Sequence, residues 1–528
     1  MSVATWPTAL SGPRPARARR FYNNASIGAS RLRFRSPRRR AGAEVLALLA
    51  AAATVAAVVA IAAGLLGGND GNAGSILVNT RTVGSDPLAF DPSRSAAYER
   101  AAAFGLSHVL FAKSPGGVAR TATRTTRFRP LVEKAVAGTG LDPGTVEAMI
   151  FLESAGRPEA IAGRDPAAAA GLTQILAETA RNLLGMPVNL AASRRLTRRI
   201  DSAETRGDTA AVERLQAKRR KVDARFDPAQ AIAGAVRYLR LAQGRFGSSS
   251  LAVVSYHMGI GNLEGILRTY ARRPQGDISA IVGERDLSWA RVYFDSSPTR
   301  HRDAWLRLVA LGDDSQTYYW RVLAAREIIR LYRADPRALD RLAQLQGHGQ
   351  SAEQVLHPLN GTKRFPTPEA LVKAWKRHDL RALPDDPGRM HFRISPRMGG
   401  LASRVGGRPT SYRGLRPQAL RLLVYLARWV HNLSGVATPL TVGQAAYDEK
   451  YQRLLAARGS KHAARSSLHT TGYAFDILRR YQSGAQAAAF QYTLERLETL
   501  GLIAWSREPS VIHITVASEA GGLRISAR

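Results

Sequence analysis

The sequence predicts a multidomain protein with a single N-terminal transmembrane helix, an all-α domain and a C-terminal α+β domain. Three observations favour this fold class. An uncharged apolar run stands near the N-terminus, helical periodicity dominates the middle of the chain, and β-rich runs appear only late. The 528 residues exceed what one hydrophobic core normally covers, so two or three domains are expected.

The charge balance indicates an anionic partner. Lys and Arg total 76 against 41 Asp and Glu, which gives a formal net charge of +35. Such a surplus suits nucleic acid, an anionic membrane face or an acidic polymer. The chain has no cysteine, and this excludes disulfides and thiolate metal ligands.

The first 66 residues predict a basic tail (1–44) followed by a membrane anchor (45–66). The tail holds ten arginines, and the anchor runs for 22 residues without a charge. At about 1.5 Å per residue, such a helix spans a hydrocarbon core of about 30 Å. A buried soluble helix would show a polar face, and a cleavable signal peptide has a shorter apolar region. We favour an uncleaved anchor with the tail in the cytoplasm, so nucleic acid is not expected as the partner.

Residues 67–127 are predicted to form a linker, rich in Gly and Asn at first, with one helix near 94–105. The region 128–335 follows, and its periodicity is helical. We expect one helix over 128–138, and Pro143 opens the next helix.

The helix that begins at Pro143 carries an apolar run that ends at Glu153. A carboxylate in such a place is partly desolvated, and this raises its pKa. It can then hold a proton near neutral pH, which a general acid must do. An ordinary solvated helix-end glutamate is the alternative interpretation.

Four sequence blocks in this region form an ordered pattern. They are Glu153-Ser154, Gly171-Leu172-Thr173-Gln174-Ile175, Ser255-Tyr256-His257-Met258-Gly259-Ile260-Gly261-Asn262 and Thr317-Tyr318-Tyr319. Together they resemble the soluble-lytic-transglycosylase family, whose members have a lysozyme-like α fold and cleave peptidoglycan. Thr173 stands where that family has Met, and His257-Met258 stands where it has Asn-Ala.

The resemblance implies a role for five residues. Glu153 corresponds to the single catalytic acid/base, and Ser154 beside it to a substrate contact. Gln174 corresponds to a sugar or peptide contact, and a loop hydrogen bond is its alternative. Tyr256 corresponds to the aromatic residue near the carboxylate, with core packing as the alternative. His257 takes the place of the family's asparagine and could still donate a hydrogen bond to the substrate.

Two further segments of the chain are predicted to have supporting roles. A charged insertion at about 190–225 indicates a solvated helix pair, which could also touch a wall polymer. Residues 336–410 are expected to be a connecting module with a short strand at 391–394. His391 in that strand is interpreted as structural, with a metal ligand as the alternative. Glycosidases usually need two carboxylates. No second acidic residue stands at an obvious matching place, and Asp165, which lies in a Gly/Pro loop, is interpreted as a turn residue.

The C-terminal region, 411–518, is predicted to be α+β, with a short tail at 519–528. An amphipathic helix is expected over 415–432, and strands over 473–477 and 511–516. His469 and Asp476 can converge there, and a third ligand from another strand would leave one coordination position open. Imidazoles and a carboxylate around an open position suit catalytic zinc.

His469, Gly472, Asp476 and the later strand residue His513 resemble the zinc D-Ala-D-Ala carboxypeptidase family. The resemblance implies that His469, Asp476 and His513 are zinc ligands. The family's usual base position is Ser510 here, so Glu508 is the candidate base. An active peptidase, a slow zinc-bound domain and a domain that only binds wall peptides all remain open, as does a reading of three unrelated structural residues.

The anchor and both resemblances point to one polymer, peptidoglycan, outside the cytoplasmic membrane, in the periplasm or cell wall. We expect an anchored lytic transglycosylase that cuts the MurNAc–GlcNAc bond with a 1,6-anhydro product, and it could act in a cell-wall enzyme complex. The alternatives are a non-catalytic wall-binding scaffold, a zinc peptidase with a targeting-only helical domain, and a muramidase that releases reducing ends.

Overall fold

The computed structural model describes residues 86, 88–347, 352–358, 361–458 and 467–518. The predicted cytoplasmic tail, the predicted anchor at 45–66 and the tail at 519–528 lie outside these ranges. No helix within the described ranges has both the length and the apolarity needed to cross a bilayer.

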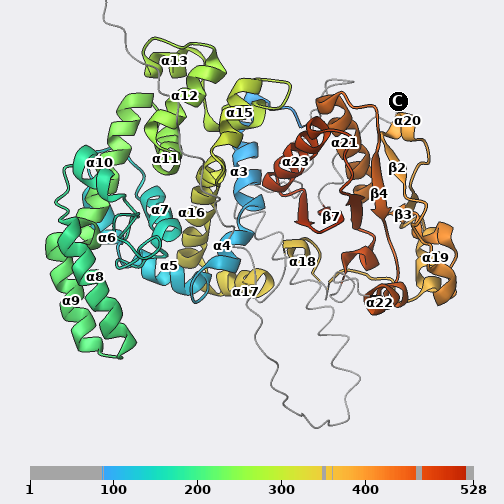
Figure 1. Ribbon diagram of the computed structural model, residues 1–528, viewed down its shortest axis with the longest axis horizontal. Helices are drawn as coiled ribbons and strands as arrows, with labels where there is room; N and C mark the ends of the chain where they lie inside the picture. Colours follow the sequence, from blue (N-terminus) through green and yellow to red (C-terminus); the bar gives the residue numbers. More distant parts are fainter. Residues whose placement is uncertain (1–85, 87, 348–351, 359–360, 459–466, 519–528) are drawn as a thin grey trace, which may run out of the picture. The chain divides into compact units, whose positions relative to one another are not determined.

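Residues 95–347 form a helical part without a named strand (Figure 1). The helix expected near 94–105 is present, and two more helices follow it inside the segment predicted as a linker. The α-helices of this part are α3 (Ser95–Gly105), α4 (His108–Lys113), α5 (Val118–Thr126), α6 (Arg129–Val136), α7 (Pro143–Ser154), α8 (Leu190–Thr205), α9 (Thr209–Val222), α10 (Pro228–Phe246), α11 (Ser249–Met258), α12 (Ile260–Ala271), α13 (Ile278–Glu284), α14 (Trp289–Asp295), α15 (Arg302–Ala310), α16 (Tyr318–Ala334) and α17 (Pro336–Gly347).

Helix α7 begins where the sequence predicts. Asp142 is its N-cap and accepts hydrogen bonds from the backbone N–H groups of Gly144 and Thr145, while Pro143 occupies the first helical position. The helix ends at Ser154 because Ala155 takes the left-handed conformation, with φ of 53°. The chain therefore turns away directly after Glu153, and this leaves the glutamate in the last helical turn.

Helix α7 packs along α16, and an ion cluster around one buried glutamate joins the two helices far from Glu153. The Glu147 side chain is fully buried on α7. It pairs with Arg129 of α6 at 2.7 Å and with Arg333 of α16. A buried carboxylate is stable only when cations or hydrogen bonds compensate for lost solvation. The cluster therefore fixes the register of α7 on α16.

The loop after α7 is held against a fully buried arginine. Arg225, in the 3₁₀ turn Ala224–Phe226, donates to the carbonyls of Pro166, Ala168 and Ile175 at 2.6–3.1 Å and pairs with buried Asp223 at 2.7 Å. Gly171 lies against the same turn with φ of +78°, and a Cβ there would stand 1.7 Å from the carbonyl oxygen of Arg225. Only glycine fits this contact.

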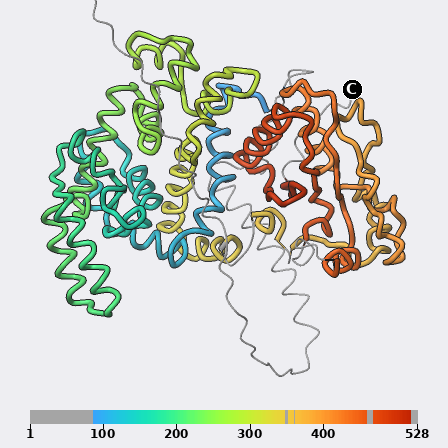
Figure 2. The backbone as a smooth tube through the Cα atoms, in the orientation of Figure 1, coloured from blue at the N-terminus to red at the C-terminus, as the bar shows by residue number. Residues whose placement is uncertain are grey.

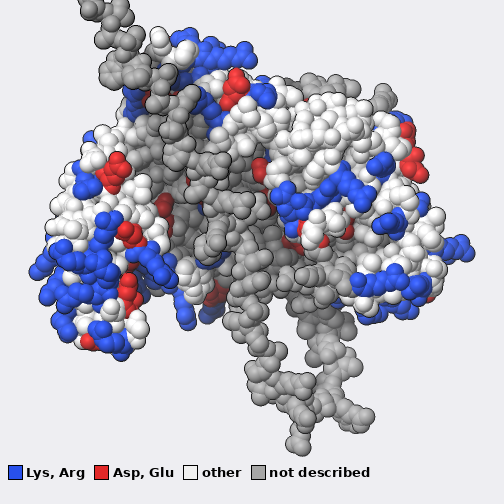
Figure 3. Space-filling model, viewed as in Figure 1, with Lys and Arg blue, Asp and Glu red and all other residues white. Residues whose placement is uncertain are grey.

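The charged insertion is a helix pair, as predicted. Helices α8 and α9 pack side by side, and they carry many of the basic side chains of this face (Figure 3). Their small apolar cluster of Ile200, Ala203 and Leu215 is buried between them. Arg219 and Arg220 of α9 reach back to Glu159 in the loop after α7. The pair is therefore tied to the loop that follows the Glu153 helix.

The strands of the C-terminal part lie in the orange-to-red end of the chain (Figures 1 and 2). Five form one sheet in the order β2-β4-β5-β7-β6, in which β2 and β4 are parallel and the other neighbours antiparallel. A separate pair joins β1 and β3. The strands are β1 (Arg381–Ala382), β2 (Phe392–Ile394), β3 (Gly414–Leu415), β4 (Leu440–Gln444), β5 (Ala474–Leu478), β6 (Ile503–Arg507) and β7 (Val511–Val516).

Two long helices pack together with this sheet, and shorter helices connect its strands. Phe475 and Ile477 of β5 and Ile512 and Ile514 of β7 are buried in the core that the sheet shares with the long helices. Asp476 of β5 and His513 of β7 alternate with these core residues, so they face the opposite side of the sheet. The helices are α18 (Ala352–Leu356), α19 (Pro368–Lys376), α20 (Pro387–Met390), α21 (Pro417–Ser434), α22 (Glu449–Ala457) and α23 (Gly484–Thr499).

We expect Arg225→Met to lower the free energy of unfolding by about 3–5 kcal/mol, because it leaves Asp223 buried without its cation. Arg194→Met is the matched control, since Arg194 pairs with Asp165 of the same loop in an exposed salt bridge. Such pairs contribute at most about 1 kcal/mol. Denaturant unfolding followed by the fluorescence of buried Trp289 and Trp320 measures both. Equal, small effects would contradict the anchoring role of Arg225.

Candidate functional site

Glu153 lies at the wall of a cavity of about 340 Å³. Helix α4, the end of α7 and the turn before α16 line it, with Lys113, Arg157, Asp314 and Arg321 as the other charged residues. Tyr318, the first residue of α16, donates a hydrogen bond of 2.7 Å to Glu153 Oε1. The carboxyl group therefore combines a fixed position with access to a space that a ligand could enter.

The surroundings of Glu153 favour its protonated form. Burial raises the pKa of Glu153 to about 7, although the Tyr318 hydrogen bond and the Arg321 charge oppose the shift and Asp314 adds to it. Arg321 is itself engaged with Asp314, whose carboxylate lies 2.5 Å from its guanidinium. A carboxyl group with a pKa near neutrality can both donate and accept a proton at neutral pH.

His257 supports this arrangement from behind Tyr318. Its ring stacks on the Tyr318 ring, with centroids 5.1 Å apart, and its Nδ1 lies 2.7 Å from the hydroxyl of Ser315. The sequence interpretation gave His257 a direct contact with substrate, and that remains a prediction. The observed contacts give His257 an indirect role as well: its ring packs against Tyr318, which donates the hydrogen bond to Glu153.

Tyr256 lies near the same carboxylate. Burial and the nearby Glu153 charge raise the pKa of Tyr256 well above its usual value. Its hydroxyl donates to the carbonyl of Thr173 at 2.8 Å, and its ring meets Tyr238 edge-on at 5.1 Å. Tyr256 therefore joins helix α11 to the loop that follows Gly171.

Two other predicted contacts are engaged within the protein. The amide nitrogen of Gln174 donates to the carbonyls of Ala160 and Gly171, and its backbone has a positive φ of 50°. These are loop hydrogen bonds, which the sequence interpretation gave as the alternative role of Gln174. Ser154 is buried, and its hydroxyl donates to the carbonyl of Ile150 in the preceding turn. Direct substrate contacts by Gln174 and Ser154 remain predictions.

Asp165 has the turn role that the sequence indicates, since its side chain accepts from the backbone N–H of Ala167 at 2.8 Å. The sequence interpretation gave no role to Tyr318 or Arg321. Tyr318 stood in the fourth block, but its contact with Glu153 joins residues 165 positions apart. The block marked Tyr318 as a candidate, and only the packing of α16 on α7 shows its partner.

The C-terminal part contains a second candidate site, and strand register builds it. Asp476 of β5 and His513 of β7 are direct cross-strand partners, so their side chains lie on the same face of the sheet. His469 comes from the 3₁₀ turn Leu468–Thr471, which ends in Gly472 with φ of +80° just before β5. His469 Nε2 and His513 Nδ1 lie 3.0 and 2.8 Å from Asp476 Oδ1.

The donor set of this cluster fits a divalent metal ion. One ligand atom from each of His469, Asp476 and His513 lies within 4.8 Å of the others. Burial opposes ionisation of Asp476, but the two histidines hold its pKa below the usual range. The other ring nitrogen of His469 lies 2.8 Å from the carbonyl of Ala445, which fixes the ring. Two imidazoles and a carboxylate are typical zinc ligands.

The cluster opens into a large cavity of about 1020 Å³. Glu508, at the β6–β7 turn, lines this cavity together with Ser510, and both are therefore near the cluster. Arg393, Arg397 and Arg480 line it as well. The cavity thus combines a donor set that could hold a metal, a carboxylate and cationic side chains. His391, by contrast, stacks on His431 at 3.9 Å, consistent with the structural reading of this histidine.

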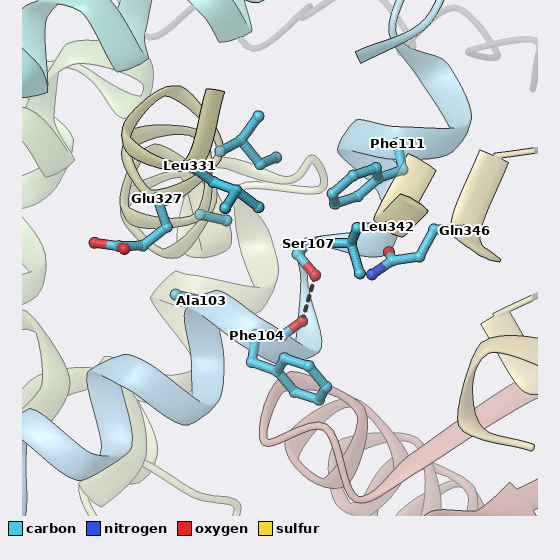
Figure 4. Close-up of a pocket in the computed structure, with 10 residues that line it drawn as sticks. Ala103, Phe104, Ser107, Phe111, Glu327, Leu331, Leu342 and Gln346 are labelled. Atoms are coloured by element: carbon cyan, nitrogen blue, oxygen red, sulfur yellow. Dashed lines mark hydrogen bonds between the residues drawn. The ribbon is translucent and has the colours of Figure 1, made fainter. Parts of the chain in front are cut away.

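A third cavity, of about 60 Å³, has a different character (Figure 4). Phe104, Phe111, Leu331 and Leu342 supply much of its lining, from α3, α4, α16 and α17. Ser107 faces this space, but its hydroxyl donates to the carbonyl of Phe104. The cavity offers apolar packing and no cluster of reactive groups, so we place the candidate chemistry at the other two.

Comparison with known families matches one part of the helical region. The family described as Transglycosylase SLT domain matches residues 207–277, which run from α9 through α12 and include Tyr256 and His257. This match supports a lytic transglycosylase that acts on peptidoglycan. It does not extend to Glu153 or to the C-terminal cluster. A search of curated proteins found no match.

We expect Tyr318→Phe to move the alkaline limb of activity to higher pH. The phenol hydrogen bond favours the ionised form of Glu153, so its removal raises the pKa of a group that starts at about 7. A hydrogen bond to a charged group contributes about 1.5–3 kcal/mol, and this corresponds to a shift of roughly one pH unit or more. The phenyl ring would keep its stacking on His257.

The pH dependence of kcat/KM for peptidoglycan turnover measures this shift. Tyr319→Phe is the matched control, because Tyr319 is the next residue of α16 and Glu153 is not among the groups that perturb its pKa. A limb at the wild-type pH in Tyr318→Phe would contradict the role of the tyrosine.

Proposed function

We propose that the chain is a lytic transglycosylase that cuts the β-1,4 bond between N-acetylmuramic acid and N-acetylglucosamine in peptidoglycan. The observation that carries this proposal is Glu153, a carboxyl group with a pKa near 7 that faces a cavity and is held by Tyr318. The family match over residues 207–277 supports the same substrate.

One carboxyl group is enough for the proposed reaction. Protonated Glu153 donates its proton to the glycosidic oxygen as the bond from the muramic acid C1 breaks. The N-acetyl group of that sugar assists the cationic centre. The 6-hydroxyl then attacks C1, and the Glu153 carboxylate accepts its proton. The products are a 4-hydroxyl end and a 1,6-anhydro ring, so no water is consumed and Glu153 regains its starting state.

The pairing of Asp314 supports the one-carboxylate mechanism. Asp314 is the other acidic residue that lines this cavity within the described part of the chain. Its carboxylate binds the guanidinium of Arg321, and its carbonyl oxygen accepts from the same residue. A two-carboxylate glycosidase needs an available nucleophile or base as its second group, whereas Asp314 is occupied by this ion pair.

We also propose that the enzyme is anchored in the cytoplasmic membrane by residues 45–66, with its tail in the cytoplasm and its catalytic parts outside. The support is the uncharged 22-residue run after an arginine-rich tail. This topology would place Glu153 on the side where peptidoglycan lies. The overall surplus of basic residues suits a polymer that carries carboxylates.

Glu153→Gln should abolish release of 1,6-anhydromuropeptides from purified sacculi, because the amide has no proton to donate to the leaving oxygen. Loss of general acid catalysis costs about 10²–10⁴-fold in rate. Glu159→Gln is the control, since Glu159 lies six residues on and binds Arg219 and Arg220. Mass spectrometry of the products measures the effect.

The same experiment separates the rival functions. A muramidase would release reducing ends, which are heavier than anhydro ends by one water. Sacculus binding without any product would indicate a wall-binding scaffold. Unchanged turnover in Glu153→Gln would refute the assignment of the acid.

A second candidate function rests on the convergence of His469, Asp476 and His513. We propose that these residues hold a zinc ion in a domain that binds or cleaves stem peptides. A bound zinc ion would lower the pKa of a coordinated water toward neutrality. The chain's own residues supply the rest of the site: Glu508 lines the cavity as a candidate base beside the cluster.

We expect the purified protein to bind one zinc ion per chain, and His469→Ala to remove this binding, because three protein ligands are needed for a tight site. Isothermal titration with zinc and elemental analysis after dialysis measure the stoichiometry. His391→Ala is the control, since His391 stacks on His431 and belongs neither to the cluster nor to the lining of its cavity. Equal zinc binding by His469→Ala and the wild type would contradict the ligand set. Stem-peptide cleavage that a chelator stops would establish the peptidase activity.

A further inference from the structure

The segment between the two predicted domains places a carboxylate beside the C-terminal cluster. Glu353 lies on α18, and its Oε1 is 3.7 Å from Nε2 of His513. The Glu353 side chain is 19% exposed. Its Oε1 atom is buried and makes no hydrogen bond within the described part of the chain. A buried carboxylate oxygen in this state can accept a further hydrogen bond.

The geometry of the His513 ring separates Glu353 from the ligand set. Nδ1 of His513 faces Asp476 Oδ1 at 2.8 Å, so the metal side of the ring is its Nδ1 edge. Nε2 lies on the opposite edge of an imidazole, and a group beside it cannot reach an ion bound at Nδ1. Glu353 therefore faces the outer nitrogen of His513 and is not a fourth ligand.

Both histidines direct one ring nitrogen at Asp476 and have an acceptor beside the other ring nitrogen. His469 turns Nε2 toward Asp476 and has its Nδ1 beside the carbonyl of Ala445 at 2.8 Å. His513 turns Nδ1 toward Asp476 and has its Nε2 beside Glu353. An acceptor at the outer nitrogen selects the tautomer that leaves the inner nitrogen free to bind metal, and an anionic acceptor also makes that nitrogen a stronger ligand.

Helix α18 is fixed to both strands that carry the cluster. His357, the residue after this helix, has its Nε2 2.5 Å from the carbonyl oxygen of Val516 on β7. Its ring also stacks on Tyr473, just before β5, at 3.9 Å. Burial lowers the pKa of His357 to about 4, so the ring is neutral at pH 7 and anchors α18 without a charge. The position of Glu353 is thus set by the same strands as Asp476 and His513.

We propose that Glu353 is a positioning residue for the metal site, where it accepts a hydrogen bond from Nε2–H of His513 and keeps Nδ1 directed at the ion. For this hydrogen bond to form, the 3.7 Å separation has to shorten to the roughly 2.8 Å of a charge-assisted hydrogen bond. This inference rests on the metal site proposed above. It also assigns α18, which lies in the predicted connecting module, to the working parts of the C-terminal site.

Zinc affinity of the full chain tests this proposal, with a chelating dye as competitor. We expect Glu353→Gln to weaken zinc binding by about 10-fold and Glu353→Ala by up to about 100-fold. Glu369→Gln is the matched control, because Glu369 is an exposed carboxylate of the same connecting module, on α19. It should bind zinc as the wild type does.

Two further readouts separate positioning from folding. The absorption spectrum of the cobalt-substituted protein should change in Glu353→Gln, because the ligand strength of His513 changes. Thermal unfolding of the metal-free protein should stay close to that of the wild type, since glutamine keeps the shape of the side chain.

The outcomes distinguish this inference from the metal site itself. A wild-type protein that binds no zinc would overturn the site and the role of Glu353 with it. The other case is that the wild type binds zinc and His469→Ala does not. If Glu353→Gln then has the zinc affinity and the cobalt spectrum of the wild type, the role of Glu353 alone is overturned. Equal weakening by Glu353→Gln and Glu369→Gln would also count against it.

Discussion

The pairing of α7 with α16 is the constraint on which the helical site depends. The two helices are joined at both ends: Glu147 of α7 binds Arg333 of α16, and Glu153 of α7 accepts from Tyr318 of α16. Helix α7 thus carries two buried or partly buried carboxyl groups with different partners. Glu147 has two guanidinium groups, which suit a structural ion cluster. Glu153 has a neutral phenol, so burial outweighs stabilisation and its pKa rises to about 7. The nature of the partner separates the structural carboxyl group from the candidate acid.

Much of the local structure was predictable because short-range chemistry decides it. Asp142-Pro143 marks a helix start in any context, and the structure has that start. The β-rich run 511–516 predicts a strand with His513 on the same face as Val511 and Thr515, and β7 confirms the strand. The helix predicted over 415–432 is α21, shifted by two residues at each end. Each of these features depends on residues within one turn or one strand.

The contacts that shape the two sites lie beyond such patterns. Arg225 supports the cleft loop through carbonyls about 50 to 60 residues away, and no periodicity indicates a fully buried arginine. Glu353 reaches His513 from a segment interpreted as a connector, because α18 folds back onto β6 and β7. Helices α4 and α5 fall in the segment predicted as a linker, whose Gly-rich beginning suggested little order. In all three cases the partner is distant in sequence, and only tertiary packing creates the environment.

The two candidate sites use opposite electrostatics, and this difference follows from their neighbours. Glu153 stands among groups that leave a proton on it near neutral pH, which suits donation to a leaving oxygen. Asp476 is also largely shielded from solvent, but two imidazoles beside it hold its pKa below the usual range and keep it ionised. Metal ligands must be deprotonated, so the surroundings of Asp476 suit the proposed metal site, and those of Glu153 suit the proposed proton transfer. The chemistry proposed for each carboxyl group is therefore a property of the side chains that the fold packs around it.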